Sequence, residues 1–391
     1  MSRGFAAFLS AQTLSAFGDA VALVAIPLLI LRGGGTVAQV GAVTALGALA
    51  TLLTGIVAGP LADRFDRRLL LRLCDVARCL LFGAVALGGD HLWLVMTAVP
   101  LAAVFSMVFQ VTYVTVVPGL VPLEKITEAN GRLYSAYAVA ALAGPAVAGL
   151  LSGATSPAVA IAVDAGTFAL SAALLSFVRV RPVEPVATEG GLAAGVRFIR
   201  RHPLLLPLTV LLTVVLAVTS ALDDVVIYHL THDLGQPDGV VGTVMTAAVV
   251  GSLVASMAVA WLRRRAGFGP LWIGAYTLAG LLVAAVGFSR SVVAIAVLAA
   301  AVLLCSGVAG IASMSLRQEV TPSHLLGRVT AAFWTLQLTL APLGAAVLTT
   351  AAGRWGVAAT LACGGAAVTL TALAALFTPM RRRVPPPPPP T

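Results

Sequence analysis

The chain has 391 residues, of which 59% are hydrophobic and only 10% are charged. Soluble domains average about 25% charged residues, so this composition excludes a soluble protein and makes lipid the solvent for most of the chain. The net charge of +9 would suit a nucleic-acid partner only if it were concentrated in one basic domain.

Twelve apolar stretches are long enough to cross a bilayer as helices, for which about 20 residues are needed. They lack the short alternating pattern of membrane β-strands, and the first is too long for a cleaved signal peptide. In chain order they are 6–31, 37–62, 73–89, 92–117, 131–153, 157–178, 204–228, 239–262, 270–288, 291–316, 325–351 and 356–378.

The basic residues predict the orientation of these spans. With the N-terminus inside, only Arg32, Arg290 and Arg354 fall in outer loops, and an excess of Lys and Arg marks cytoplasmic loops. We therefore expect a multi-pass membrane protein with both termini in the cytoplasm. Arginine outnumbers lysine by 23 to one, which suggests a GC-rich bacterial genome and hence the bacterial cytoplasmic (inner) membrane. Because the positive charge follows loop topology, it indicates no nucleic-acid partner.

A polar interval, "VRPVEPVATEGGLAAGVRFIRRHP", divides the spans into two groups of six. Its Pro-Val-Glu-Pro start is typical of a linker, and Leu192–Arg201 can form a short amphipathic helix on the inner membrane surface. The expected organisation is a six-helix bundle at 1–179, a cytoplasmic linker at 180–203, a second bundle at 204–380, and a basic, polyproline tail at 381–391.

The two halves resemble each other. "VPLEKITEANGRLYSAYAVAALAGPAVAG" and "TPSHLLGRVTAAFWTLQLTLAPLGAAV" share the pairs Pro122 and Pro322, Arg132 and Arg328, and Pro145 and Pro342. An internal repeat of six spans is typical of secondary transporters, which hold substrate near the bilayer midplane between the repeats.

The loop "GPLADRFDRRLL" concentrates charge between two apolar spans. It resembles the Gly-x-x-x-Asp-Arg-x-Gly-Arg-Arg/Lys signature of the major facilitator superfamily, with matches at Gly59, Asp63, Arg64, Arg67 and Arg68. Asp66 replaces the usual glycine, and aspartate tolerates a left-handed turn better than most residues. The resemblance implies that Asp63 caps the start of span 325–351 and that the arginines form a cytoplasmic latch between the halves; a plain topology anchor is the alternative.

A second motif points toward export. "AALAGPAVAG" resembles the exporter signature Gly-x-x-x-Gly-Pro-x-x-Gly-Gly, with matches at Gly144, Pro145 and Gly149. "LSAFGDAVALVAIPLLIL", "LVPLEKITEAN" and "VDAGTFALSAALL" are similar to the enterobactin- and macrolide-exporter branch of the superfamily. The likeness covers almost the whole chain, although small residues at this spacing also serve plain helix packing.

Ionisable residues inside a membrane are functional candidates. Asp19 lies about 24 and 20 Å along a helix from Arg3 and Arg32, near the midplane. We expect a lone carboxylate there that binds a proton or a cationic substrate, with Gln12 and Ser15 on the same face; a structural carboxylate is the alternative. Asp75 with Arg78, and Asp164, are expected to be structural.

The remaining candidates come from span ends and from family architecture. Asp223 and Asp224 fall at the outer edge of the hydrocarbon and suggest an outer-gate or rim feature, with proton handling as the alternative. His229 and His232 are expected in an exposed outer loop. The resemblance nominates Gln110, Tyr113, Trp334 and Gln337 as cavity residues. The stretch "AAVFSMVFQVTYVTVVPGL" lacks the arginine of many drug–proton antiporters, which leaves the proton route open.

The sequence indicates no enzyme and no cofactor, because it has no phosphate-binding Gly-x-x-x-x-Gly-Lys loop and its four cysteines lack metal-ligand spacing. The expectation is an all-α major facilitator fold that acts as a monomeric secondary transporter and exports a hydrophobic or amphipathic small molecule by proton antiport. The alternatives are a proton-coupled nutrient importer of the same fold, and a lipid scramblase or non-transporting receptor.

Overall fold

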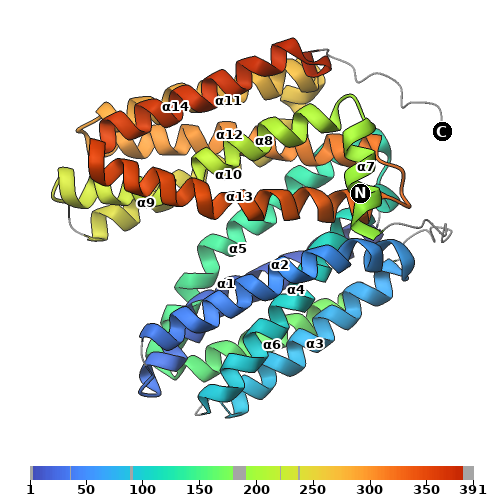
Figure 1. The fold of residues 1–391 in the computed structure, drawn as a ribbon. Coiled ribbons are helices and arrows are strands. Elements are labelled where there is room, and N and C mark those ends of the chain that lie inside the picture. The colour runs from blue at the N-terminus through green and yellow to red at the C-terminus, as the bar shows by residue number, and fades with distance from the viewer. Residues whose placement is uncertain are drawn as a thin grey trace. The chain divides into compact units, whose positions relative to one another are not determined.

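The computed structural model describes residues 3–35, 37–88, 91–178, 191–220, 222–236 and 238–381. These ranges contain helices and connecting turns and no strand, as expected for an all-α membrane protein. The long helices are α1 (Arg3–Arg32), α2 (Val37–Arg64), α3 (Arg67–Gly88), α4 (Leu92–Leu120), α5 (Ile126–Ala154), α6 (Pro157–Leu175), α8 (Leu205–Thr219), α10 (Asp238–Ala266), α11 (Phe268–Phe288), α12 (Val292–Val320), α13 (Leu326–Trp355) and α14 (Val357–Ala374) (Figure 1). The short elements are η1 (Leu123–Lys125), α7 (Gly191–Arg201), α9 (Leu222–Tyr228), the π-helical η2 (His229–Asp233), η3 (Ala375–Phe377) and η4 (Pro379–Arg381).

The expected membrane spans correspond to these helices. Ten helical segments in the described ranges are long and apolar enough to cross a bilayer. Two of the long helices are outside this set of ten. They are α3, which carries Arg72, Asp75 and Arg78 in its middle, and α13, which has 30 residues. The span expected at 204–228 corresponds to a candidate span at Leu205–Asp233, which contains α8, α9 and η2.

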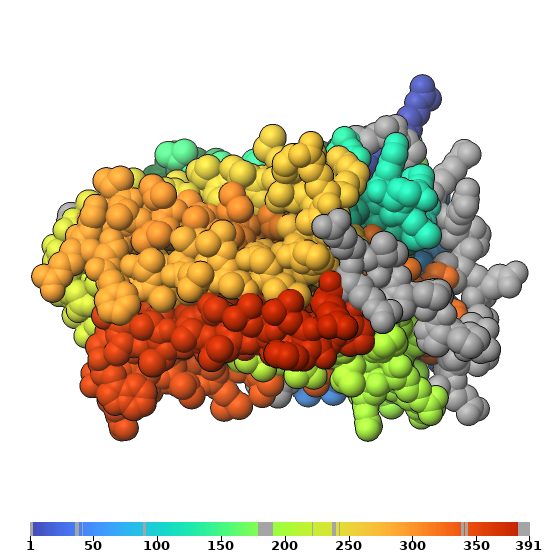
Figure 2. Space-filling view, turned by 90° about the horizontal axis from the view of Figure 1, so that it is seen from above, coloured from blue at the N-terminus to red at the C-terminus, as the bar shows by residue number. Residues whose placement is uncertain are grey.

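The chain forms two compact units, each with its own core. Unit 1 comprises Met1–Ala129, Ala136–Val196 and Thr321–Ala332, and unit 2 comprises Asn130–Ser135, Arg197–Val320 and Phe333–Thr391. In unit 1, α1 and α3 both pack against α6, and the rings of Phe82 and Phe168 stack at 5.9 Å between centroids. In unit 2, α14 lies along α11 (Figure 2) and α10 packs against α12.

The internal repeat is visible in local structure. The carbonyl of Pro122 accepts a hydrogen bond from the amide of Lys125 at 2.9 Å, and the carbonyl of Pro322 accepts one from Leu325 at 3.0 Å. Each turn leads into a long helix, α5 or α13. The sequence resemblance between the halves therefore reflects a repeated turn-and-helix unit.

Glycines at matching places of the repeat bring helices into close approach. A Cβ on Gly131 would lie 2.4 Å from the carbonyl oxygen of Ser256 on α10, and a Cβ on Gly327 would lie 2.8 Å from that of Gly59 on α2. Small residues at such positions allow helix backbones to meet in a membrane. The start of α5 thus packs on α10 much as the start of α13 packs on α2.

The amphipathic helix expected in the linker is α7. Ile199 on its apolar side is buried, whereas Arg197, Arg200 and Arg201 are exposed. A Cβ on Gly195 would lie 2.3 Å from the carbonyl oxygen of Arg328, so α7 packs closely on the start of α13. Its position at the membrane surface stays a prediction, and the linker residues 179–190 and tail residues 382–391 lie outside the described residues.

Candidate functional site

The site centres on the buried guanidinium of Arg78, which α3 carries into the interior of unit 1. Its Nη2 donates to the carboxylate of Asp75 and, at 3.0 Å, to the hydroxyl of Ser15. Its Nη1 lies 3.3 Å from Oδ2 of Asp19. One arginine, only 1% exposed, therefore links a carboxylate on its own helix to a carboxylate on α1.

Aromatic rings complete the surroundings of this arginine. The guanidinium carbon lies 4.6 Å from the ring centroid of Phe109 on α4 and 4.2 Å from that of Phe168 on α6. A cation over an aromatic face gains about 2 kcal/mol or more when it is desolvated. These contacts, together with two carboxylates, offset part of the cost of burying a charge.

One face of α6 lines the same region. Asp164, Phe168 and Ser171 are spaced i, i+4 and i+7, so they lie on one side of the helix. Ser171 donates to Oδ2 of Asp75 at 2.6 Å. Asp164 is 0% exposed, and neither of its carboxyl oxygens has a hydrogen-bond partner in the described part of the chain.

Gly18 is what lets α1 approach this face of α6. A Cβ there would lie 2.1 Å from Oδ1 of Asp164 and 2.3 Å from Oγ1 of Thr167. The absence of a side chain at position 18 therefore makes room for the buried carboxyl. Because Gly18 directly precedes Asp19, the two aspartates belong to one cluster.

The expectation of a lone carboxylate at Asp19 is wrong, because Asp19 pairs with Arg78. The side chain of Asp19 is 42% exposed, whereas that of Asp75 is fully buried. The spacing of three between Asp75 and Arg78 correctly predicted their pair, but it could not show that the arginine also reaches α1. The cluster is larger than the sequence predicted, because helices distant along the chain pack together.

Among the other polar candidates of unit 1, Ser15 contacts Arg78 at hydrogen-bond distance. Oε1 of Gln12 is buried without a hydrogen-bond partner among the described residues. On α4, Gln110 is exposed and Tyr113 is half-buried. The hydroxyl of Ser106, one turn before Gln110, lies 3.5 Å from Nη1 of Arg78 and is a contact that sequence reasoning missed.

The remaining candidates belong to unit 2. Trp334 is half-buried, and Gln337 is buried with no hydrogen-bond partner for its Nε2 in the described structure. Asp223 and Asp224 are exposed and occupy the first turn of α9, where the helix dipole stabilises negative charge.

One of the two histidines departs from expectation. His232 is exposed, but His229 is buried between the carboxylate of Asp233 at 2.7 Å and the carbonyl of Ser289 at 3.0 Å. The π-helical turn at His229–Asp233 folds its ring inward, so the prediction of an exposed His229 is wrong.

The charged loop after α2 makes the predicted cap. Oδ1 of Asp63 accepts from the amide of Gly327 at 2.9 Å, and Oδ2 accepts from the amide of Arg328 at 3.1 Å. These amides belong to the first turn of α13, where backbone donors have no partner within the helix. The side chain of Arg328 adds an ion pair at 3.5 Å. Gly59 allows this approach, because a Cβ there would lie 2.9 Å from the carbonyl oxygen of Gly327.

The arginines of the loop do different things. Arg67 is buried and donates to the carbonyls of Thr115 at 2.9 Å and Ser323 at 2.6 Å, so it joins α4 to the turn before α13. Arg68 donates to the carbonyl of Ser176, at the end of α6, and Arg64 is exposed. Of the three arginines expected in the latch, Arg67 makes the contact that reaches the second half of the sequence.

Asp66 does not adopt the left-handed turn that was expected of it. No residue other than glycine has a positive φ in the described ranges. Oδ1 of Asp66 instead accepts from the amide of Leu69 at 2.7 Å, so Asp66 caps the start of α3. A side-chain cap replaces the glycine turn, because aspartate is a favoured N-cap residue.

The exporter-like motif on α5 packs against α1 beside the cluster. A Cβ on Gly144 would lie 2.4 Å from the Cβ of Ala20 and 3.1 Å from the amide nitrogen of Val21. α5 continues through Pro145, and nothing lies within 4 Å of a Cβ built on Gly149. Close packing is therefore present at Gly144, next to Asp19, and not at Gly149.

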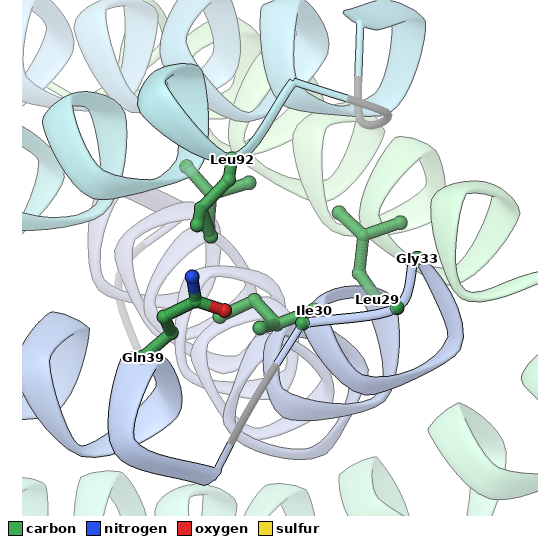
Figure 3. Close-up of a pocket in the computed structure, with 8 residues that line it drawn as sticks. Leu29, Ile30, Gly33, Gln39 and Leu92 are labelled. Carbon is green, nitrogen blue, oxygen red and sulfur yellow. The ribbon is translucent and has the colours of Figure 1, made fainter.

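A small pocket lies at the far end of α1. Its walls include Leu29, Ile30, Gly33, Gln39 and Leu92, and the amide of Gln39 points toward Leu92 (Figure 3). Leu29 is about 15 Å along the helix from Asp19, so this pocket is separate from the charged cluster. Among the described residues, no three His, Cys, Asp or Glu side chains are grouped so that they could hold a metal ion.

The long apolar helices and the repeated turn-and-helix unit define a multi-pass membrane protein. The sequence matches the family model of the Major Facilitator Superfamily over residues 8–345, and the chain belongs to this superfamily. Its members are transporters rather than enzymes.

Curated relatives and solved structures extend this assignment. The chain is 24% identical over 383 residues to the multidrug efflux pump Tap of Mycolicibacterium fortuitum, covering 94% of this chain and 93% of the relative. It is 27% identical over 398 residues to Tap of Mycobacterium tuberculosis strain H37Rv, covering 96% and 93%. A bacterial homologue of the iron transporter ferroportin has a TM-score of 0.80 at 17% identity, covering 96% of this chain and 99% of that one. The fucose:proton symporter of E. coli has a TM-score of 0.76 at 13% identity, covering 95% and 98%.

Proposed function

We propose that this transporter exports a hydrophobic or amphipathic small molecule, such as a drug, an antibiotic or a siderophore, by proton antiport. The observation that carries the proposal is its similarity along nearly the whole chain to relatives named multidrug efflux pumps. We further place the protein in the bacterial cytoplasmic membrane as a monomer with both termini inside.

Asp19 supplies the proton-binding group in this scheme. Its carboxylate is partly exposed and lies within 3.3 Å of Arg78, so ions or substrate can reach it while the arginine holds its charge. Uptake of a proton would weaken the pair and release the guanidinium. In this scheme Arg78 on α3 takes the place of the arginine that many drug–proton antiporters carry in the span corresponding to α4.

The proton gradient is large enough to drive export. Moving one charge inward contributes about 2.3 kcal/mol per 100 mV, and each unit of pH difference adds about 1.4 kcal/mol. At about 100 mV and one unit of pH difference, one proton per cycle would therefore sustain a gradient of roughly a hundredfold or greater for a neutral substrate.

The cap of Asp63 on α13 would act as a cytoplasmic latch. Alternating access requires two conformations of similar free energy, and a partly buried carboxylate at a helix N-terminus contributes up to about 2 kcal/mol. A contact of this size can favour one conformation without trapping it.

Substrate contacts are assigned to the polar and aromatic candidates of both units, namely Gln12, Gln110, Tyr113, Trp334 and Gln337. None of these five residues is charged, and this suits a bulky, mostly apolar ligand held by a small number of polar groups. Asp223 and Asp224 are assigned to the outer rim.

A proton-coupled importer on the same fold is the second candidate. The likeness to a fucose:proton symporter favours it, but that likeness is at 13% identity and concerns the fold alone. Import would make cells expressing the protein accumulate a nutrient, whereas export would make them retain less of a toxic compound.

The test uses a bacterial host that lacks its own efflux pumps. Wild type, Asp19→Asn, the matched control Glu124→Gln and empty vector are compared for growth inhibition and retention of macrolides, siderophores, dyes and lipophilic cations. Glu124 is exposed in the turn before α5, so its neutralisation should leave transport intact. We expect wild type and Glu124→Gln to lower retention of some compounds and Asp19→Asn to match the vector. Equal retention in wild type and vector for every compound would contradict export.

A further inference from the structure

The buried carboxyl of Asp164 is not explained by its packing. It is fully buried on α6, and both of its carboxyl oxygens lack a hydrogen-bond partner in the described structure. The nearby hydroxyl of Thr167 donates to the main-chain carbonyl of Asp164 at 2.7 Å. An isolated carboxylate in an apolar interior is very costly, whereas a neutral carboxylic acid costs far less. A role confined to structure would be served better by an asparagine or an apolar residue.

The groups around Asp164 come from the helices packed against α6. α1 contributes Asp19, whose neighbour Gly18 makes the close approach to Asp164. α3 contributes Arg78 and the thiol of Cys79, and Asp75 pairs with the same arginine. The arginine lies over Phe168, one turn from Asp164 on the same face. The cluster thus contains three carboxyl groups and a single guanidinium.

The single arginine cannot pair with all three carboxylates. Asp75 is held on both sides, by Arg78 and by the hydroxyl of Ser171. Asp19 is held more loosely, at 3.3 and 3.5 Å from Nη1 of Arg78, and its side chain is 42% exposed. Asp19 is therefore the partner that Arg78 exchanges most easily.

We propose that Asp164 is a second proton-binding site, which shares one proton with Asp19 by competing for Arg78. In the arrangement described here Asp164 holds the proton and Asp19 is ionised against the arginine. When Asp19 takes up a proton, Arg78 turns toward Asp164, which releases its own. The total charge of the cluster is the same in both arrangements, so the exchange needs no other ion.

This site deepens the antiport mechanism, and its use in transport rests on that proposed function. A proton entering at the exposed carboxyl of Asp19 would leave from the buried carboxyl of Asp164, and the movement of Arg78 would connect the two events. The helices that carry these groups, α1, α3 and α6, would then respond together to one proton.

The test is infrared spectroscopy of the purified protein in lipid vesicles at neutral pH, with the proton as the only ligand. A protonated carboxyl without hydrogen-bond partners gives a high-frequency C=O band. We expect this band in wild type and in the control Glu124→Gln, its loss in Asp164→Asn, and its displacement in Asp164→Glu, which keeps a carboxyl and decides the assignment if Asp164→Asn does not fold. In Asp19→Asn the band should weaken, because Arg78 is free to pair with an ionised Asp164.

The outcomes separate this site from the export function. Absence of the band in wild type, or a band unchanged in both variants at position 164, overturns the proton site even if efflux is active. An unchanged band in Asp19→Asn overturns the sharing of the proton. A band that behaves as expected in a protein without efflux leaves the site standing and removes only its role in export.

Discussion

The cap that Asp63 places on α13 gives the sharpest prediction. Asp63→Ala removes the acceptors of two backbone amides, those of Gly327 and Arg328, and leaves the side chain of Arg328 without its ion pair. We expect the start of α13 to open more often, because these amides have no partner within the helix.

The size of the effect follows from the contacts. Loss of an N-cap side chain costs about 0.5–2 kcal/mol, and loss of a negative charge at a partly buried helix N-terminus costs up to about 2 kcal/mol. Since the two estimates describe overlapping contacts, we expect about 1–2 kcal/mol, which corresponds to roughly 5–30-fold in an opening equilibrium. Asp63→Asn should lose nearly as much, because the single side-chain oxygen of asparagine can accept from only one of the two amides and the side chain carries no charge.

Hydrogen exchange measured by mass spectrometry tests this directly. Peptides covering 326–332 should exchange about 5–30 times faster in Asp63→Ala than in wild type. Asp66→Ala is the matched control, since Asp66 caps α3 through the amide of Leu69 and its loss should affect only peptides at the start of α3. Unchanged exchange at 326–332 in Asp63→Ala, or the same acceleration in Asp66→Ala, would refute the reasoning.

Two further predictions concern packing and pH. Gly18→Ala should lower the free energy of unfolding by about 1–3 kcal/mol, because the new Cβ would lie 2.1 Å from Oδ1 of Asp164. The control Gly166→Ala on α6 adds a Cβ that meets nothing within 4 Å, so it should be neutral or stabilising. Equal melting temperatures for the two purified variants would contradict this prediction. Burial lowers the pKa of His202 below its ordinary 6.5, and its Nδ1 accepts from the amides of Leu204 and Leu205 at the start of α8. The unfolded chain therefore binds the proton more readily, and the free energy of unfolding should fall as the pH drops below about 6.5. In His202→Asn, whose side chain can still cap α8, the melting temperature should no longer show this fall when it is measured against pH.

Much of the architecture could be predicted from the sequence, because lipid forces backbone polar groups to be satisfied within each segment. Apolar stretches of sufficient length therefore predicted helices nearly one by one. The cap of Asp63 was also predictable, since its motif resembles a family signature and that resemblance implies the partner helix. The burial of His229 was not predictable, because its contact with the carbonyl of Ser289 joins residues 60 positions apart.

The charged cluster was only half predictable. The sequence by itself determined that Asp19 lies within a membrane span, and that Asp75 and Arg78 face the same way on α3, because helical periodicity fixes both. Only the tertiary structure decided that Arg78 also reaches Asp19 and that Asp164 lies buried beside Gly18, since these contacts join α1, α3 and α6 across 59 or more positions of the chain. Periodicity acts within a helix, whereas the helix that a given face meets is decided by packing of all the helices together.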